Sequence, residues 1–222
     1  GGIGMNGKSL LSSFINTTIE RWPMVLDSIL SHLSISLMSL AIAVLIGVPL
    51  GIFITRHRKF ASVIIKIASV FQTIPSVALL GFMIPFFGIG RKPAVIALTI
   101  YALLPILQNT YTGIVNCDEA AKEAGKGMGM TSFQVLYMIE IPLSLSIIMA
   151  GIRTATVMTI GVATLASLIG AGGLGDLIFR GIASVNPGLI LTGAVPSAVL
   201  AVLFDSIFRF LERQLTPKGL RK

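Results

Sequence analysis

Residues 116–142 read NCDEAAKEAGKGMGMTSFQVLYMIEIP and form a charged, polar segment between two long apolar runs. Within this segment, Glu123-Ala124-Gly125 is followed by Gly129 and then by Ile139-Glu140-Ile141-Pro142. Glycine supplies the backbone freedom that a reversal of the chain needs, so the pattern predicts a short helix that ends around Gly125–Gly129. A polar helix and turn held between apolar helices is suited to docking a soluble partner.

The residues at either end of this segment predict the caps of its helices. Asn116 can cap the short helix, with Glu119 three residues later reaching back to the backbone. Thr131 or Ser132 can cap the helix that follows, because both hydroxyls can accept a backbone hydrogen bond.

Composition places the chain in the membrane. Hydrophobic residues make up 54% of its 222 residues and charged residues only 12%, with a mean hydropathy of +0.91. Soluble domains carry about twice that charged fraction, and several uncharged runs of about 20 residues are typical of transmembrane helices. The net charge of +8 does not indicate nucleic acid, since most cations flank apolar runs. Cys117 is the only cysteine, so the chain cannot form an internal disulfide.

Uncharged runs predict five spans in an all-α integral membrane protein. Four of them are short enough for one span each: Leu33–Ile54, Ile67–Ile89, Pro93–Val115 and Gly181–Phe204. The remaining run, Ile141–Gly175, would be roughly 50 Å long as one straight helix, which is much longer than the hydrocarbon core is thick, about 30 Å. We therefore expect a helix that ends near Leu168, a glycine-rich turn, and a short segment near Leu177–Ile182.

The distribution of cations orients these spans, because basic residues favour the cytoplasmic side. With the N-terminus outside, ten cations lie on the inner side: Arg56, Arg58, Lys59, Lys122, Lys126, Arg209, Arg213, Lys218, Arg221 and Lys222. Five lie on the outer side: Lys8, Arg21, Arg91, Lys92 and Arg180. Lys66 and Arg153 fall within or beside spans and are not counted. The bias predicts an N-terminus outside and a cytoplasmic C-terminus.

The same pattern predicts three segments along the chain. Residues 1–27 form an N-terminal lead-in, of which residues 1–4 look like a cloning remnant ahead of Met5. Residues 28–212 form the transmembrane domain, including the polar loop 116–134. Residues 213–222 form a basic tail that is expected to be solvated.

Three features within the spans are candidates for a translocation pathway or gate. Pro75 interrupts the second run, and three polar residues surround it: Gln72, Thr73 and Ser76. Such a break is tolerated where protein or a water-filled cavity receives the freed carbonyls, although ordinary packing of a kinked helix explains it equally well. Arg153 either snorkels, pairs with a carboxylate or faces the pathway. Gly172 and Gly173 belong to a G-x-G-x-x-G string, which after a membrane helix indicates a flexible extracellular turn rather than a dinucleotide site.

The spacing that starts at Glu123 resembles the EAA loop of binding-protein-dependent ABC importers, E-A-A-x3-G-x9-I-x-L-P, and departs from it at Gly125 and Ile141. Glu119-Ala120-Ala121 spells EAA literally, but the positions downstream of it do not fit. In that family the loop receives the stroke of the ATPase. The resemblance therefore implies a set of coupling residues: Ala120, Ala121, Glu123, Ala124, Gly125, Gly129, Met130 and Thr131.

Further strings, including Gly47-Val48-Pro49-Leu50-Gly51 and Gly151-Ile152-Arg153-Thr154-Ala155, resemble permeases of osmoprotectant ABC importers, which take up glycine betaine, carnitine and choline. The resemblance implies a type I importer fold in the bacterial cytoplasmic membrane, surrounded by lipid. Its implied partners are a second permease, two ATPases that hold ATP and Mg, and an extracellular binding protein. The chain ends at Lys222, so that binding protein is expected as a separate chain or a removed fusion.

On this interpretation the chain is a transport subunit and not an enzyme, without a cofactor, metal or nucleic-acid partner of its own. The alternatives that stay open are a channel or secondary carrier that does not use ATP, and a related solute such as ergothioneine.

Overall fold

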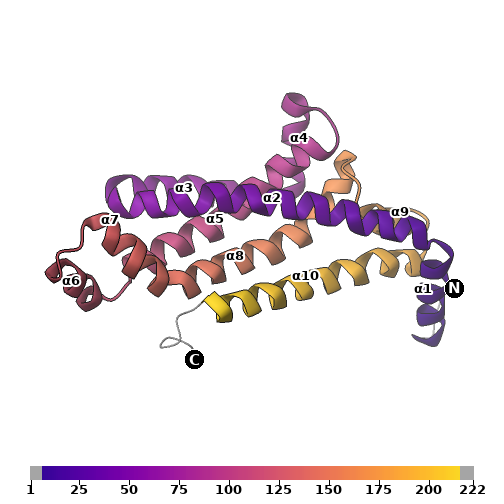
Figure 1. Ribbon diagram of the computed structural model, residues 1–222. Coiled ribbons are helices and arrows are strands. Elements are labelled where there is room, and N and C mark those ends of the chain that lie inside the picture. Colours follow the sequence, from indigo (N-terminus) through magenta and orange to yellow (C-terminus); the bar gives the residue numbers. More distant parts are fainter. Residues whose placement is uncertain (1–6, 216–222) are drawn as a thin grey trace. The chain divides into compact units, whose positions relative to one another are not determined.

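The computed structural model describes residues 7–215, and every regular element within them is helical (Figure 1). The elements in order are α1 Gly7–Glu20, α2 Trp22–Arg56, α3 Arg58–Thr73, α4 Ser76–Phe87, α5 Arg91–Val115, α6 Glu119–Gly127, α7 Ser132–Val135, the π-helix η1 Leu136–Glu140, α8 Ile141–Ala163, the 3-10 helix η2 Leu165–Ile169, α9 Leu174–Ala183 and α10 Pro187–Leu215. The expected remnant at residues 1–4 and the solvated tail at 216–222 lie outside the described residues.

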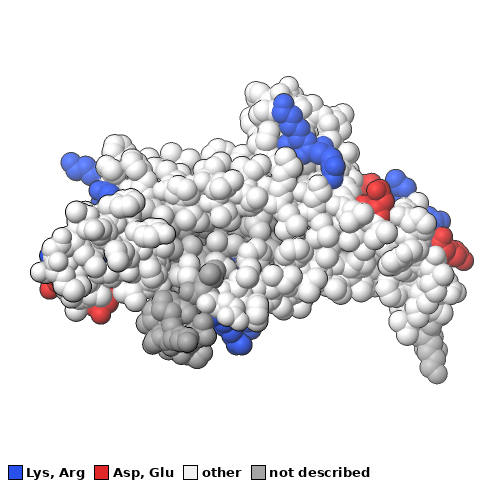
Figure 2. All heavy atoms as spheres, viewed as in Figure 1, with Lys and Arg blue, Asp and Glu red and all other residues white. Residues whose placement is uncertain are grey.

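Four stretches of helix are long and apolar enough to cross a membrane: Trp22–Arg56, Arg91–Val115, Ser132–Ala163 and Pro187–Gln214. The pair α3 and α4 makes a fifth when it is counted as one broken span, which agrees with the predicted number. On the face shown in Figure 2, charged side chains cluster in a few places and leave most of the surface uncharged, as expected for a surface in contact with lipid.

The described chain falls into two compact units. Among the described residues, the first unit contains the stretches 7–39, 74–98 and 158–202, and the second contains 40–73, 99–157 and 203–215. Each of the four long helices contributes residues to both units.

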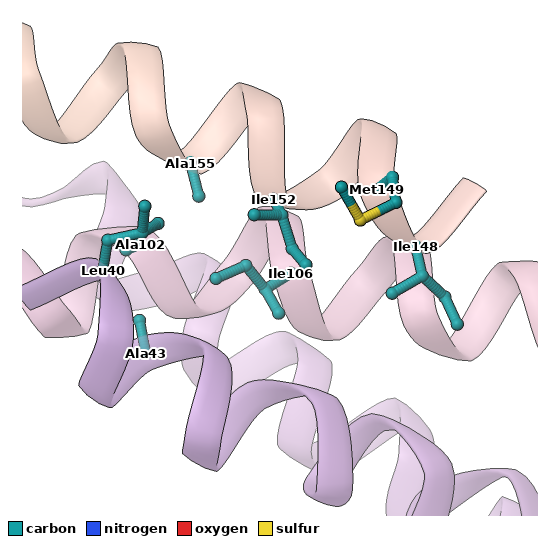
Figure 3. Close-up of a cluster of buried hydrophobic side chains, with 8 residues drawn as sticks. All are labelled: Leu40, Ala43, Ala102, Ile106, Ile148, Met149, Ile152 and Ala155. Atoms are coloured by element: carbon teal, nitrogen blue, oxygen red, sulfur yellow. The ribbon is translucent and has the colours of Figure 1, made fainter. Parts of the chain in front are cut away.

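The core of the second unit forms where α2, α5 and α8 pack together (Figure 3). Its buried side chains are Leu40, Ala43, Ala102, Ile106, Ile148, Met149, Ile152 and Ala155. Two glycines of α2 allow α5 to approach closely, because a Cβ at Gly47 would lie 2.9 Å from Ile106 Cγ2 and one at Gly51 would lie 2.7 Å from Thr110 Cβ. This Gly-xxx-Gly spacing is the pattern by which small residues let membrane helices pack backbone to backbone.

The core of the first unit joins the N-terminal part of α2 to α9 and α10. Val25, Leu174, Leu177 and Leu189 are buried together there. The 3-10 helix η2 packs against both α4 and α9. At Gly175 there is no room for a side chain, because a Cβ would overlap the carbonyl oxygen of Thr164.

The helix boundaries confirm several sequence predictions and shift others. The predicted break in the second run is present between Thr73 and Ser76. The fourth span ends as α8 at Ala163, and η2, a turn and α9 follow it, close to the predicted positions. The helix of the first span, α2, begins earlier than its apolar run, at Trp22, so it includes part of the expected lead-in. At the other end, α10 extends through Leu215, three residues into the expected tail.

Candidate functional site

The helix α6 is the first element of the candidate site, and both of its ends are capped. Asp118, rather than the expected Asn116, accepts a hydrogen bond of 3.0 Å from the backbone N–H of Ala120. Asp118 is the residue that directly precedes the first helical turn, which is where a cap must lie. Glu119 in the first turn and Lys126 in the last turn both complement the helix dipole.

A glycine in the left-handed region ends α6. Gly129 has φ +82°, its N–H bonds to the carbonyl of Lys126 at 2.9 Å, and the next N–H, of Met130, bonds to the carbonyl of Gly125 at 3.1 Å. These paired bonds define a Schellman motif, which satisfies carbonyls that the end of a helix otherwise leaves unpaired. The predicted helix end within Gly125–Gly129 is therefore confirmed.

One face of α6 is exposed and carries small side chains. Ala120, Glu123, Ala124 and Gly127 are all exposed and follow the i, i+3, i+4, i+7 spacing of a single helical stripe. We call these four residues the α6 stripe. Its only large side chain is Glu123, so a partner surface can close tightly around the helix.

The opposite face of α6 packs against η1. Gly125 is buried, and a Cβ there would lie 2.5 Å from Ile139 Cδ1 and 3.2 Å from Met130 Sδ. Glycine at this position thus lets α6 lie directly on the π-helix at the start of the fourth span. Ala121 is half-buried on the same side.

A second capping motif fixes the return of the chain into the span. The Thr131 hydroxyl accepts from the N–H of Gln134, and the Gln134 side chain accepts from the N–H of Thr131, which together form a capping box. Thr131 is one of the two predicted caps. The chain then passes through α7 and η1 into α8 (Figure 1).

The π-helix carries a carboxylate that sequence reasoning did not single out. Glu140 is buried, with a side chain 4% exposed, and it forms an ion pair with Arg56, the last residue of α2. A buried carboxylate needs such a partner, because an isolated charge is costly to remove from water. The pair ties the start of the fourth span to the end of the first, and α6 rests on the same π-helix. A force applied to α6 would therefore reach both spans.

The eight residues expected in the coupling loop thus lie in one continuous element of α6 and the turn after it. The candidate pathway residues are divided between the two units. Gln72 and Thr73 end α3 in the second unit, where the Gln72 side chain donates to the carbonyl of Tyr101 at 3.3 Å. Pro75 and Ser76 begin α4 in the first unit.

Arg153 pairs with two carboxylates of α10. It lies 3.0 Å from Asp205 and 3.2 Å from Glu212, and Arg209 also reaches Asp205 at 3.1 Å. One of the sequence alternatives, pairing with a carboxylate, is therefore present. The signal that could have found it is the spacing of Asp205 and Glu212, seven residues or about two helical turns apart, which places both on one face.

Gly172 and Gly173 form a tight turn at the start of α9. Both have positive φ, +79° and +94°, and a Cβ at either position would crowd α2: Gly172 lies beside Ser31, and Gly173 beside His32. His32 is buried, and its Nε2 lies 3.1 Å from the carbonyl oxygen of Ile160. The turn is therefore closely packed against α2 in the first unit.

Two kinds of bound group, a metal ion and a nucleotide, can be compared with the residues that could hold them. Among residues 7–215, no set of three His, Cys, Asp or Glu side chains is arranged to hold a metal ion. Residues 2–9 spell G-x4-G-K-S, which binds nucleotide phosphates only in a loop between a strand and a helix. The first five of these residues lie outside the described chain, and within the described part no strand is present.

The helical fold is that of a membrane component of an ABC importer, and comparison with known proteins gives the family. Residues 47–217 match the family described as "Binding-protein-dependent transport system inner membrane component", and the chain belongs to this family. It is similar to the glycine betaine/carnitine/choline transport system permease protein OpuCB of Bacillus subtilis, with 49% identity over 86% of this chain and 88% of that protein. It is also similar to the carnitine transport permease protein OpuCB of Listeria monocytogenes, with 51% identity over 93% and 91%.

A solved structure supports the fold independently. The inward-facing MetNI methionine ABC transporter matches with a TM-score of 0.80 at 22% identity, over 89% of this chain and 99% of that one. This likeness confirms the expected type I importer permease fold.

The buried thiol of Cys117 gives a test of this region. Burial raises the pKa of Cys117 above its ordinary value of 9.0, and only the thiolate reacts with maleimide. We expect slow labelling at pH 7 that is still accelerating at pH 9, where an exposed thiol has begun to level off. The rate of maleimide labelling against pH checks this expectation, and a rate at pH 7 equal to that of free cysteine would contradict it.

Proposed function

We propose that this chain is the membrane-spanning permease subunit of an ATP-driven importer for small quaternary amines such as glycine betaine, carnitine or choline. Support for the substrate class comes from the names of relatives that are 45–51% identical to it, among them the osmoprotectant import permease protein OsmW of Salmonella typhimurium. Sequence identity at this level over most of both chains favours a shared solute class.

The observation that supports the transport mechanism most directly is the packing of α6 against the π-helix η1. Its exposed stripe of small residues is open to a partner, while its buried Gly125 rests on η1. In our proposal each of two ATPases, which hold ATP and Mg, closes around the stripe of one permease. Hydrolysis then moves α6, and the Arg56–Glu140 pair carries this movement into two spans.

The remaining parts of the proposal follow from the family. A second permease, identical or homologous, completes the membrane domain, and an extracellular binding protein delivers the substrate. The bias of ten cations to five supports an N-terminus outside and α6 in the cytoplasm of a bacterial cell. A single Met128→Cys in a Cys117→Ala background tests this orientation, since Met128 is 72% exposed. An impermeant maleimide should label it only from the cytoplasmic side.

Uptake by reconstituted complexes tests the function. The chain, its ATPase and its binding protein are placed in proteoliposomes, and uptake of labelled glycine betaine is measured with and without internal ATP. We expect uptake only with ATP, and competition by carnitine or choline but not by methionine. Uptake that proceeds equally without ATP would replace the proposal with a channel or carrier, and competition by methionine alone would replace the substrate class.

The pathway residues are a further part of the proposal, with Gln72 as the most direct test. Gln72→Ala removes one polar side chain at the end of α3, and we expect a lower uptake rate with little change in preference between two betaines. A site with few convergent polar groups discriminates weakly among similar solutes. Ser69→Ala on the same helix is the control, because its hydroxyl bonds only within α3, to the carbonyl of Ile65. A tenfold change in preference, about 1.4 kcal/mol, would show that the permease itself selects.

A further inference from the structure

A hollow of about 250 Å³ lies between α6, the start of α3 and the π-helix in the second unit. Its walls come from eight residues: Arg56, Arg58, Glu119, Lys122, Lys126, Ser132, Val135 and Glu140. Six of these are charged, which is unusual for a cavity at the end of apolar helices in a chain with only 12% charged residues.

The charges of the hollow do not balance. Both carboxylates are already paired, Glu140 with Arg56 and Glu119 with Lys122 at 2.7 Å. Within residues 7–215, no carboxylate forms an ion pair with the two remaining cations, Arg58 and Lys126. Four cations against two anions leave the hollow with a net charge of +2.

The pKa of Glu119 is affected by the same excess of positive charge. Its pKa lies below the ordinary value, first because Lys122 donates a hydrogen bond to it and also because the charges of Lys126 and Arg58 are close. Cations of both α3 and α6 thus lower the pKa of the same carboxylate, although the two helices lie about 60 residues apart in sequence. Lys122 is also largely withdrawn from solvent, with a side chain 13% exposed, so its charge is less screened than that of a surface lysine.

The position of the hollow indicates which anions can reach it. Arg56 is the last residue of the first span, and Glu140 directly precedes the apolar helix α8. The hollow therefore lies at the depth where the apolar part of the chain gives way to the polar part. Phospholipid phosphates lie at that depth in a bilayer, and basic pockets between membrane helices bind such groups.

We propose that this hollow is a phosphate-binding site, with Arg58 and Lys126 as its principal ligands. Arg56 and Lys122, held in place by their carboxylate partners, complete the positive wall. The phosphate belongs either to the headgroup of an anionic lipid or to free inorganic phosphate. A bound phosphate would join α3 to α6 through Arg58 and Lys126, and so would fix the coupling helix to the membrane surface. The proposal concerns binding and stands independently of the transported solute.

A comparison of two charge-matched double variants tests the site. Arg58→Gln with Lys126→Gln removes both principal ligands. Lys66→Gln with Arg213→Gln removes the same net charge from exposed cations of α3 and α10 that do not line the hollow. The purified full chain is placed in phosphatidylcholine nanodiscs, and retention of spin-labelled phosphatidylglycerol is measured. A second arm measures radiolabelled inorganic phosphate by equilibrium dialysis.

We expect saturable binding of at least one of the two probes to the wild type and to the control variant. The Arg58 and Lys126 variant should bind that probe at least tenfold more weakly. Retention of phosphatidylglycerol over phosphatidylcholine identifies a lipid site, and saturable binding of phosphate alone identifies a free-anion site. Equal losses in both double variants, or no binding of either probe to the wild type, would overturn the proposal. Helical content measured by circular dichroism confirms that the variants are folded.

Discussion

Glu123→Lys is expected to abolish ATP-driven uptake while leaving the chain folded in the membrane. Glu123 is the one large side chain of the α6 stripe, and it is exposed. Changing an exposed residue normally alters the free energy of unfolding by less than about 0.5 kcal/mol. Lysine at this position would place the opposite charge inside the contact with the partner. Such a mismatch costs roughly several kcal/mol of binding free energy. Uptake of labelled glycine betaine should fall more than a hundredfold, and the ATPase should no longer copurify.

The neighbouring Glu119 provides the comparison for this prediction. It belongs to the literal EAA string, but in the structure it pairs with Lys122 and lines the hollow instead of the α6 stripe. Glu119→Lys should therefore keep more of the uptake than Glu123→Lys does. If Glu119→Lys abolishes uptake and Glu123→Lys leaves it near the wild-type rate, the coupling motif begins at Glu119 and our assignment is wrong.

Gly175→Ala is expected to lower the stability of the fold strongly. A Cβ at this position would overlap the carbonyl oxygen of Thr164 and lie 2.6 Å from Ser167 Oγ. The nearest obstacle is backbone, which a change of rotamer cannot relieve, so α9 and η2 must separate. Forced overpacking costs roughly 1–3 kcal/mol or more, and we expect the upper end of this range. The midpoint of thermal unfolding in detergent, followed by circular dichroism, measures the effect.

Gly161→Ala is the matched control for Gly175→Ala. Gly161 lies inside α8 in the same unit, and a Cβ there would meet no atom within 4 Å. Replacing a helical glycine by alanine in open space stabilises a helix by roughly 0.5–1 kcal/mol. The two alanine variants should therefore shift the midpoint in opposite directions. A Gly175→Ala midpoint within one degree or so of wild type would mean that the contact with Thr164 is not tight in solution.

Local patterns in the sequence predicted much of this fold, because a membrane helix can be recognised from its long run of uncharged, apolar residues. Uncharged runs located the spans, Pro75 located the break between α3 and α4, and glycines located the end of α6 at Gly127. Each of these signals is carried by residues close together in the chain. The start of α2 was misplaced because Asp27 and His32 interrupt the uncharged run after Trp22, yet the helix continues through both residues.

The features that escaped prediction depend on residues far apart in the sequence. The partners of Arg153 lie 52 and 59 positions away, and Arg56 is separated from Glu140 by 84 positions. Arg56 and Lys122 both belong to the cations counted on the inner side, but nothing in the sequence indicates that they share one hollow. Only the packing of α3, α6 and η1 brings these charges together. The choice of Asp118 over Asn116 as a cap was a local ambiguity, since either side chain can accept the bond.

The π-helix between α7 and α8 has a consequence for how this chain tolerates insertions and deletions. A π-turn holds one more residue than an α-turn, so removing a single residue from Leu136–Glu140 would let the segment revert to regular α-helix. Because the extra residue is taken up within a single turn, the helix on either side of the deletion would keep nearly the same facing, and α6 would stay on the same side of the span. A deletion within the regular helix α8 would instead rotate everything before it by about 100° about the helix axis. The π-turn is therefore a place where this helix can lose one residue while α6 keeps its orientation.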